Sequence, residues 1–166
     1  LCKVAVILYG STQRSRRERR IFEAHADLGY QYETPYGLPI PVGAYALAAS
    51  RHMAQYGTKP EQLAELAVST REWAKLNPAA YKREPLTIDD VLSSEMIASP
   101  LHRLDCCLVT DGGGCVVVVS PEIAKTIPKA PIWLLGQGES HSHAQISEMP
   151  DLTISPAKES GKRAFK

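Results

Sequence analysis

The segment CCLVTDGGGCVVVV, residues 106–119, decides the fold class of this 166-residue chain. It ends in four consecutive valines, and an unbroken run of β-branched residues favours a strand. A run without a polar face is typical of a strand that is covered on both sides. A helix is expected directly after it, because Ser120 can serve as its cap and Pro121 suits the first helical position.

The three glycines of this segment, residues 112–114, have two interpretations. Phosphate-binding loops run from a strand through glycines to the N-terminus of a helix, whose free amides hold the phosphate. Here the glycines precede a strand instead. We therefore interpret them as positions where backbones pack closely within a sheet, with Asp111 as part of the same structural motif.

Working outward, two more apolar runs predict strands, one from Val4 to Tyr9 and one from Ile132 to Leu135. The sequence between the first strand and residue 106 predicts helices instead. The predicted order is strand, long insertion, strand, short helix and strand. This order indicates an α/β fold.

Three helices are predicted in the long insertion from their ends. Gly57 suits the C-terminal cap of the first helix, and Thr58-Lys59-Pro60-Glu61 is a capping box with proline in the first turn of the second. Thr87-Ile88-Asp89-Asp90 is a weaker capping box for the third. The predicted helices are residues 44–56, residues 60 to about 77, and residues 88 to about 92.

The composition is that of an ordinary globular protein, with 44% hydrophobic and 22% charged residues. Nineteen Lys and Arg residues against 18 Asp and Glu residues leave a net charge of +1, so nucleic-acid binding is not expected. No apolar run is long enough for a membrane span, and the opening LCKVAVILYG lacks the features of a signal peptide. We expect a soluble, cytoplasmic protein and, because the chain opens without Met inside an apolar run, a fragment of a longer one.

The four cysteines, Cys2, Cys106, Cys107 and Cys115, form no spaced framework. Neighbouring cysteines do not easily bridge to each other, and Cys2 and Cys115 do not supply the second pair that a zinc site needs. We expect reduced thiols that pack as small hydrophobic groups.

A metal site is also conceivable at His141-Ser142-His143, with Glu139 or Glu148 as a further ligand. Two imidazoles on one side of an extended segment would suit a transition metal. No other ligand cluster has the spacing to complete the site, so a polar loop is the preferred interpretation and no metal is predicted.

Five arginines lie within seven residues, from Arg14 to Arg20. Such a cluster is most often a solvated face or a loop. The functional alternative is that it attracts a phosphorylated ligand, because guanidinium groups bind phosphate in bidentate geometry. The sequence leaves both interpretations open.

Three longer segments together resemble one known family. They are YGLPIPVGAYALAASRHMAQYGTKPEQLAELAVSTREWAKLNP from residue 36, PLTIDDVLSSEMIASPLHRLDCCLVTDGGGCVVVVSPEIA from residue 85, and GQGESHSHAQISEMPDLTISPAKESGKRAF from residue 136. The chain resembles the lipid-transfer-protein branch of the thiolase superfamily, close to the sterol-carrier-protein thiolases. The most specific feature is the CC-x-x-TDGGG strand that follows the EQLAELAV helix.

This resemblance implies a thiolase-like α/β fold, with two similar halves of mixed sheet and covering helices and a helical loop domain inserted into the first half. By this comparison residues 1–10 are a late strand of the N-terminal half and residues 11–102 the inserted loop domain. Residues 103–130 are then the closing strand and helix of the N-terminal half, and residues 131–166 the start of the C-terminal half. The fold is therefore expected to be incomplete in this chain.

In that family an activated cysteine attacks a thioester carbonyl, and a histidine and a second cysteine move protons. Thiolate attack needs a lowered pKa and an oxyanion hole. The resemblance places these groups outside this sequence, and Cys2 does not match the nucleophile. No catalytic residue is predicted here, apart from Tyr45 as a candidate for proton transfer.

Five positions are predicted to line the substrate site by the same resemblance. Ala44 and Tyr45 match the segment that faces the thioester pocket, although tyrosine departs from the usual small or sulfur-bearing residue and is otherwise a core aromatic. Cys107 matches a position near the pantetheine arm. Lys82 and Arg83 match the region that binds the nucleotide end of coenzyme A, where cations suit the phosphates; elsewhere they would be ordinary surface residues.

The resemblance implies an acyl-CoA-dependent enzyme that cleaves or forms carbon–carbon bonds, with lipid or steroid side-chain substrates. The alternatives are a retro-aldolase and a non-catalytic acyl-CoA or lipid carrier on the same scaffold. Coenzyme A is then a substrate or product, and no covalently bound cofactor is predicted. The expected partners are a second copy of the chain, as a homodimer, and an OB-fold protein.

Overall fold

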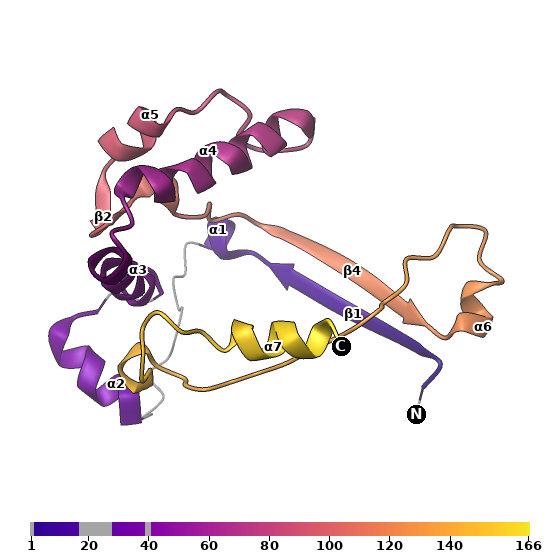
Figure 1. Cartoon of the computed structure of the whole chain (residues 1–166). Helices are drawn as coiled ribbons and strands as arrows, with labels where there is room; N and C mark the ends of the chain where they lie inside the picture. Colours follow the sequence, from indigo (N-terminus) through magenta and orange to yellow (C-terminus); the bar gives the residue numbers. More distant parts are fainter. Residues whose placement is uncertain (1, 17–27, 39–40) are drawn as a thin grey trace. The chain divides into compact units, whose positions relative to one another are not determined.

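The computed structural model describes residues 2–16, 28–38 and 41–166 of the chain. It divides into two compact units, each described by itself (Figure 1). The strand unit consists of residues 1–21, 108–139 and 159–166, and the helical unit of residues 22–107 and 140–158. Both strands and helices are present, so the α/β class is confirmed. Of the arginine cluster, Arg17, Arg19 and Arg20 lie outside the described residues.

An antiparallel ribbon of two strands, β1 (Val4–Ser11) and β4 (Gly112–Val119), forms the centre of the strand unit (Figure 1). The register is unbroken along the full length of both strands. A Cβ atom on Gly113 would lie 3.0 Å from the carbonyl oxygen of Tyr9, so glycine permits the close approach of the two backbones. The interpretation of the glycines as close-packing positions is confirmed at Gly113.

The apolar side chains of this ribbon are exposed on both faces. Ile7 and Val116 are each 60% exposed, and Val6 and Val117 are 57% and 56% exposed. The described residues supply no cover for either face of these strands, so the prediction that both faces are covered stays a prediction. A strand is buried only when further layers pack on its faces, and two strands alone do not supply them.

Three helices flank the ribbon in sequence. One of them, α6 (Pro121–Ala124), begins at Pro121 as predicted, and the carbonyl of Ser120 accepts the N–H of Ala124 at 2.9 Å. The three helices are α1 (Gln13–Arg16), α6 (Pro121–Ala124) and α7 (Ala157–Ala164), of which α7 begins in the helical unit and ends in the strand unit.

The third predicted strand, Ile132 to Leu135, is absent from the structure, where this described segment has no regular conformation. Ile132 and Leu135 are 98% and 95% exposed. A strand needs a second backbone to satisfy its amides and carbonyls, and no described strand pairs with this segment. The prediction of a strand here is wrong for this chain by itself.

The helical unit contains short helices and one small antiparallel hairpin of β2 (Met96–Ala98) and β3 (Leu101–His102). Its helices and 3-10 helices (η) are α2 (Leu28–Glu33), η1 (Thr34–Tyr36), α3 (Val42–Tyr56), α4 (Pro60–Leu76), α5 (Ile88–Ser93), η2 (Arg103–Asp105) and η3 (Ile146–Glu148). Helix α4 packs against α5 and η2, and α2 packs against η3. No helix in the described ranges is long and apolar enough to cross a bilayer.

Two of the predicted helix ends are confirmed. Gly57 has a φ of 71° and donates its N–H to the carbonyl of Met53 at 2.9 Å, which ends α3. Thr87 caps α5: its Oγ1 accepts the N–H of Asp90 at 3.1 Å, and Asp90 Oδ2 accepts the N–H of Thr87 at 2.9 Å.

The capping box of α4 is displaced by one residue from the predicted position. The cap is Lys59 rather than Thr58, and the Lys59 N–H donates to Gln62 Oε1 at 2.8 Å. The hydroxyl of Thr58 is instead hydrogen-bonded to His52 Nδ1 at 2.8 Å, which ties the turn to α3. Only the half of a capping box that Gln62 makes forms at α4, since the ammonium group of Lys59 cannot accept a hydrogen bond.

The buried core of the helical unit is small. Val91 on α5 and Ala64 on α4 are fully buried, and Ala46 on α3 is 4% exposed. Leu66 and Trp73, which share the apolar spacing of α4, are 67% and 74% exposed. The helix is confirmed, but these side chains of its apolar face have no cover within the described residues.

Candidate functional site

The first turn of α3 carries the two residues predicted to face a thioester pocket. The carbonyl of Pro41, directly before the helix, accepts the Tyr45 N–H at 3.3 Å. Ala44 is half-buried, and Tyr45 is 69% exposed. Within the described chain Tyr45 is therefore not a core aromatic, and its phenol is accessible to a ligand.

The two predicted phosphate-binding cations lie in the loop that joins α4 to α5. Arg83 Nη2 donates to the carbonyl of Lys75 at 3.1 Å, which holds the loop against the end of α4. Arg71 Nη1 donates to the carbonyl of Glu84 at 2.8 Å. We call the group Arg71, Lys75, Lys82 and Arg83 the basic corner.

Two charges of the basic corner, those of Lys82 and Arg71, act on the carboxylate of Glu84. Hydrogen bonds from the backbone N–H groups of Glu84 and Arg83, together with the charges of Lys82 and Arg71, hold the pKa of Glu84 below its ordinary value. The ammonium of Lys82 lies 5.6 Å from the ring centroid of Tyr81 and pairs with no carboxylate in the described residues. Lys82 is thus a cation that an anionic ligand can reach.

Tyr45 and the basic corner belong to the same unit but do not touch. No hydrogen bond or ion pair of the described residues joins Tyr45 to Lys82 or Arg83.

The thiol of Cys107 is exposed, whereas the thiol of its neighbour Cys106 is half-buried. Burial, and then the negative charge of Asp105, raise the pKa of Cys106, and its Sγ donates to the carbonyl of His102 at 3.5 Å. A raised pKa opposes thiolate formation, so Cys106 is unsuited to be a nucleophile.

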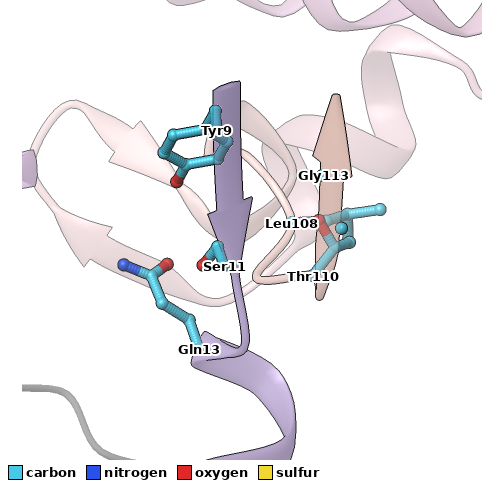
Figure 2. Close-up of a pocket in the computed structure, with 7 residues that line it drawn as sticks. Tyr9, Ser11, Gln13, Leu108, Thr110 and Gly113 are labelled. Atoms are coloured by element: carbon cyan, nitrogen blue, oxygen red, sulfur yellow. The ribbon is translucent and has the colours of Figure 1, made fainter. Parts of the chain in front are cut away.

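A hollow of about 340 Å³ lies beside the ribbon in the strand unit, and sequence reasoning did not predict it. Figure 2 shows the side chains of Tyr9 and Gln13 on the β1 side and those of Leu108 and Thr110 beside β4. Only the pairing of β1 with β4 brings these two groups together, so no local sequence signal could have revealed the hollow. Its lining residues are Tyr9, Ser11, Gln13, Leu108, Thr110, Gly112 and Gly113.

Asp111 lies in the sequence between Thr110 and Gly112, two residues that line this hollow, and its carboxylate binds the first turn of α1. Its carboxylate accepts the N–H of Arg14 at 2.8 Å, the N–H of Ser15 at 3.1 Å and the hydroxyl of Ser15. The bonds from Ser15 and then Arg14 lower the pKa of Asp111. These contacts support the structural interpretation of Asp111.

The loop with His141 and His143 does not assemble metal ligands. Glu148 Oε2 accepts the N–H groups of Ala144 at 3.0 Å and Gln145 at 3.4 Å, so this carboxylate is occupied by the backbone. The described residues contain no group of three or more His, Cys, Asp or Glu side chains that could hold a metal ion.

The burial of one charged residue was not predicted from the sequence. Glu33 at the end of α2 is 6% exposed, and its Oε1 accepts the N–H of Ser147 at 2.9 Å. The two residues are 114 positions apart, and nothing in the local sequence of either indicates the contact.

No protein-family model matches the chain. The chain is 34% identical over 159 residues to the steroid side-chain-cleaving aldolase of Thermomonospora curvata, which covers 89% of this chain and 40% of that protein. It is 31% identical over 137 residues to an acetyl-CoA acetyltransferase of Methanothermobacter thermautotrophicus, covering 82% and 36% of the two chains. It is 32% identical over 93 residues to sterol carrier protein 2 of Gallus gallus, and this match covers 54% of this chain and 17% of that protein.

A solved structure, the Ltp2-ChsH2(DUF35) aldolase, has a similar backbone. The TM-score is 0.81 at 30% sequence identity, over 99% of this chain and 45% of that one. The chain thus spans less than half the length of each of these proteins. By these similarities in sequence and backbone, the chain belongs to the sterol-carrier-protein-like branch of the thiolase superfamily.

Proposed function

We propose that the full-length protein cleaves or forms a carbon–carbon bond next to the carbonyl of an acyl-CoA thioester, on lipid or steroid side-chain substrates. The observation that carries this proposal is the similarity to an aldolase structure along 99% of the chain. The relatives named as an aldolase and an acetyltransferase support the same reaction class. Coenzyme A is then a substrate or product, without a covalently bound cofactor.

The proposed domain organisation follows the thiolase-like fold. Residues 1–10 and 103–130 belong to the N-terminal half, residues 11–102 to the inserted loop domain and residues 131–166 to the C-terminal half. The pairing of β1 with β4 supports the assignment of both strands to one half, and the helical unit, residues 22–107 and 140–158, contains most of the proposed loop domain.

The proposed substrate path runs from the basic corner to the first turn of α3. Lys82 and Arg83 bind the phosphates of coenzyme A, because guanidinium and ammonium groups form strong charge-assisted bonds with phosphate. Cys107 lies near the pantetheine arm, and Ala44 and Tyr45 line the thioester end. The exposed phenol of Tyr45 is able to give or take a proton there.

Retro-aldol cleavage is the leading reaction within this class. It is supported by the printed name of the first relative, a side-chain-cleaving aldolase, and by the aldolase structure. Retro-aldol cleavage breaks the bond between the α- and β-carbons of a β-hydroxyacyl-CoA by removing the hydroxyl proton and protonating the enolate. It consumes no free coenzyme A, whereas thiolysis of a β-ketoacyl-CoA does.

We also propose that the full-length protein is cytoplasmic, forms a homodimer and binds an OB-fold partner protein. The exposed apolar faces of the β1–β4 ribbon support association, since such surfaces are seldom left in water. The second component named with the solved aldolase supports a partner protein. Light scattering of the full-length protein tests the dimer, and a monodisperse monomer contradicts it.

The reaction is tested by incubating the full-length protein with a β-hydroxyacyl-CoA alone, and with the matching β-ketoacyl-CoA plus free coenzyme A. A shortened acyl-CoA and a carbonyl compound in the first mixture support retro-aldol cleavage, and products only in the second support thiolysis. Binding by calorimetry without any product supports the carrier alternative, to which sterol carrier protein 2 is the related name. If no acyl-CoA binds, the proposal is wrong.

A further inference from the structure

The hollow beside the β1–β4 ribbon is lined by two of the three glycines of the segment before the valines, Gly112 and Gly113. Close packing explains Gly113, because its Cβ would lie 3.0 Å from the Tyr9 carbonyl oxygen. It does not explain Gly112, where a Cβ would meet no atom within 4 Å. The glycine at this position therefore keeps space open, and that position lines a hollow of about 340 Å³.

The register of the ribbon explains why this space is open. Ser11 lies opposite Gly112, and Tyr9 lies opposite Gly114. The side chains of directly opposed residues share one face of a sheet, and so do side chains two positions apart on one strand. On this face β1 therefore supplies the side chains of Tyr9 and Ser11, whereas β4 supplies none at Gly112 and Gly114. A larger residue at Gly112 would lie beside the Ser11 side chain.

The polar side chains around the hollow form no hydrogen bond within the described part of the chain. They are the hydroxyls of Tyr9, Ser11 and Thr110 and the amide of Gln13. Each of these groups can both donate and accept a hydrogen bond. Figure 2 shows the phenol of Tyr9, the hydroxyl of Ser11 and the amide of Gln13 on one side of β1. Leu108 and the ring of Tyr9 add apolar surface to the same hollow.

None of the described side chains that line the hollow is charged. The carboxylate of Asp111, which is their neighbour in sequence, binds the N–H groups of Arg14 and Ser15. A charged ligand would lose hydration on entering and would find no opposite charge among the lining side chains. An uncharged ligand exchanges its hydrogen bonds with water for bonds to hydroxyl and amide groups. The volume is at the lower end of the usual range for small-molecule sites, about 300–1,000 Å³.

We propose that this hollow is a binding site for an uncharged small molecule that carries hydroxyl or carbonyl oxygens on an apolar ring or chain. The oxygens bind the hydroxyls of Ser11 and Thr110 and the amide of Gln13. The apolar part of the molecule lies against Leu108 and the ring of Tyr9. The whole lining belongs to the strand unit, whereas the residues of the proposed acyl-CoA path belong to the helical unit. The inference therefore goes beyond the proposed function and does not depend on it.

Binding is measured by methyl NMR on the full-length protein, with para-hydroxybenzyl alcohol as the probe. This molecule carries two hydroxyls on an apolar ring and has no charge at neutral pH. We expect the methyl signals of Leu108 and Thr110 to shift until they saturate, and those of Leu66 on α4 to stay unchanged. Para-hydroxybenzoate has a carboxylate in place of the alcohol, and we expect it to bind at least about tenfold more weakly. Equal affinities for the two probes would overturn the uncharged ligand class.

Gly112→Val tests whether the probe occupies the hollow. The new side chain meets no atom of the ribbon but takes up the open space beside Ser11, so we expect the affinity to fall about tenfold or more. The matched control is Gly10→Val. Gly10 pairs with Gly113 on the opposite face, does not line the hollow, and has the same free space for a Cβ. We expect this control to bind the probe within about twofold of the wild type.

Ser11→Ala is the second variant, because it removes a hydroxyl without adding volume. We expect a loss of affinity of about three- to tenfold, the scale of one net hydrogen bond. The inference is wrong if the wild-type Leu108 and Thr110 signals do not respond to the probe, or if both Gly112→Val and Ser11→Ala bind it like the wild type. A response to an acyl-CoA alone would assign the hollow to the proposed substrate site and would also overturn the inference. A protein that binds no acyl-CoA contradicts the proposed function and leaves these outcomes unchanged.

Discussion

The carboxylate of Asp111 accepts the backbone N–H of Ser15 at 3.1 Å, although the two residues stand 96 positions apart in the chain. This contact joins the turn before β4 to the first turn after β1. It shows that the residues around the glycine segment hold the ends of the ribbon together, in addition to pairing along it.

Asp111→Asn is expected to lower stability near neutral pH and to lose this effect in acid. Folding lowers the pKa of Asp111, chiefly through the Ser15 hydroxyl and N–H. The ionised carboxylate therefore stabilises the folded state above its ordinary pKa of 3.8, and this contribution disappears as the pH falls through the lower folded value. Urea unfolding at pH 7 and pH 3 measures the difference between variant and wild type. An equal difference at both pH values would contradict the assignment, and Glu65→Gln on α4 serves as the exposed control.

Gly138→Ala is expected to displace α7, because a Cβ there would clash with the Ser160 carbonyl oxygen and lie 2.8 Å from the Ala164 amide nitrogen. Overpacking of this kind costs roughly 1–3 kcal/mol. Gly161→Ala is the matched control, since a Cβ at that helical position meets nothing within 4 Å. The control should stabilise α7 by about 0.5–1 kcal/mol. Limited proteolysis near residue 160 distinguishes the two, and equal cleavage of both variants would contradict this packing.

Thr87→Ala is expected to destabilise α5 by about 0.5–2 kcal/mol, the usual cost of losing an N-terminal cap. The substitution removes the acceptor of the Asp90 N–H and the main cause of the lowered Asp90 pKa, so that pKa should rise toward its ordinary value. Thr87→Ser keeps the hydroxyl and should retain most of the stability. Thermal unfolding with carboxyl NMR of Asp90 measures both effects, and an unchanged Asp90 titration in Thr87→Ala would count against the cap.

Replacing both Lys82 and Arg83 with alanine is expected to weaken acyl-CoA binding by roughly 1–3 kcal/mol, the scale of hydrogen bonds to charged groups. The reason is the loss of two cations that meet the phosphates in the proposed complex. Calorimetry with an acyl-CoA measures the change, and Lys125→Ala in the strand unit serves as the charge control. Unchanged affinity in the double variant would remove the phosphate role.

Tyr45→Phe is expected to leave acyl-CoA affinity unchanged and to lower turnover, if the phenol moves a proton. The ring of Tyr45 is 69% exposed, so removing its hydroxyl should not disturb the fold of α3. Parallel calorimetry and kinetics separate binding from turnover. A variant with wild-type turnover would make Tyr45 a contact residue only.

Local features of the sequence predicted much of the helical unit. The ends of α3 and α5 follow from Gly57 and Thr87, because a left-handed glycine and a capping hydroxyl act within a few residues of the chain. The cap of α4 is Lys59 rather than Thr58, whose hydroxyl is hydrogen-bonded to His52, a contact that the motif itself does not contain.

The sequence by itself determined the helices, the β-branched strand after the glycines and the resemblance to the thiolase superfamily. These depend on intrinsic preferences and on hydrogen bonds between near neighbours. Only the tertiary structure decided that β1 pairs with β4, that Glu33 binds Ser147 and that Ile132 to Leu135 forms no strand. Each of these outcomes depends on whether a segment that is distant in sequence lies close enough to pair with a backbone or to accept its N–H. The local sequence does not indicate which distant segments come together.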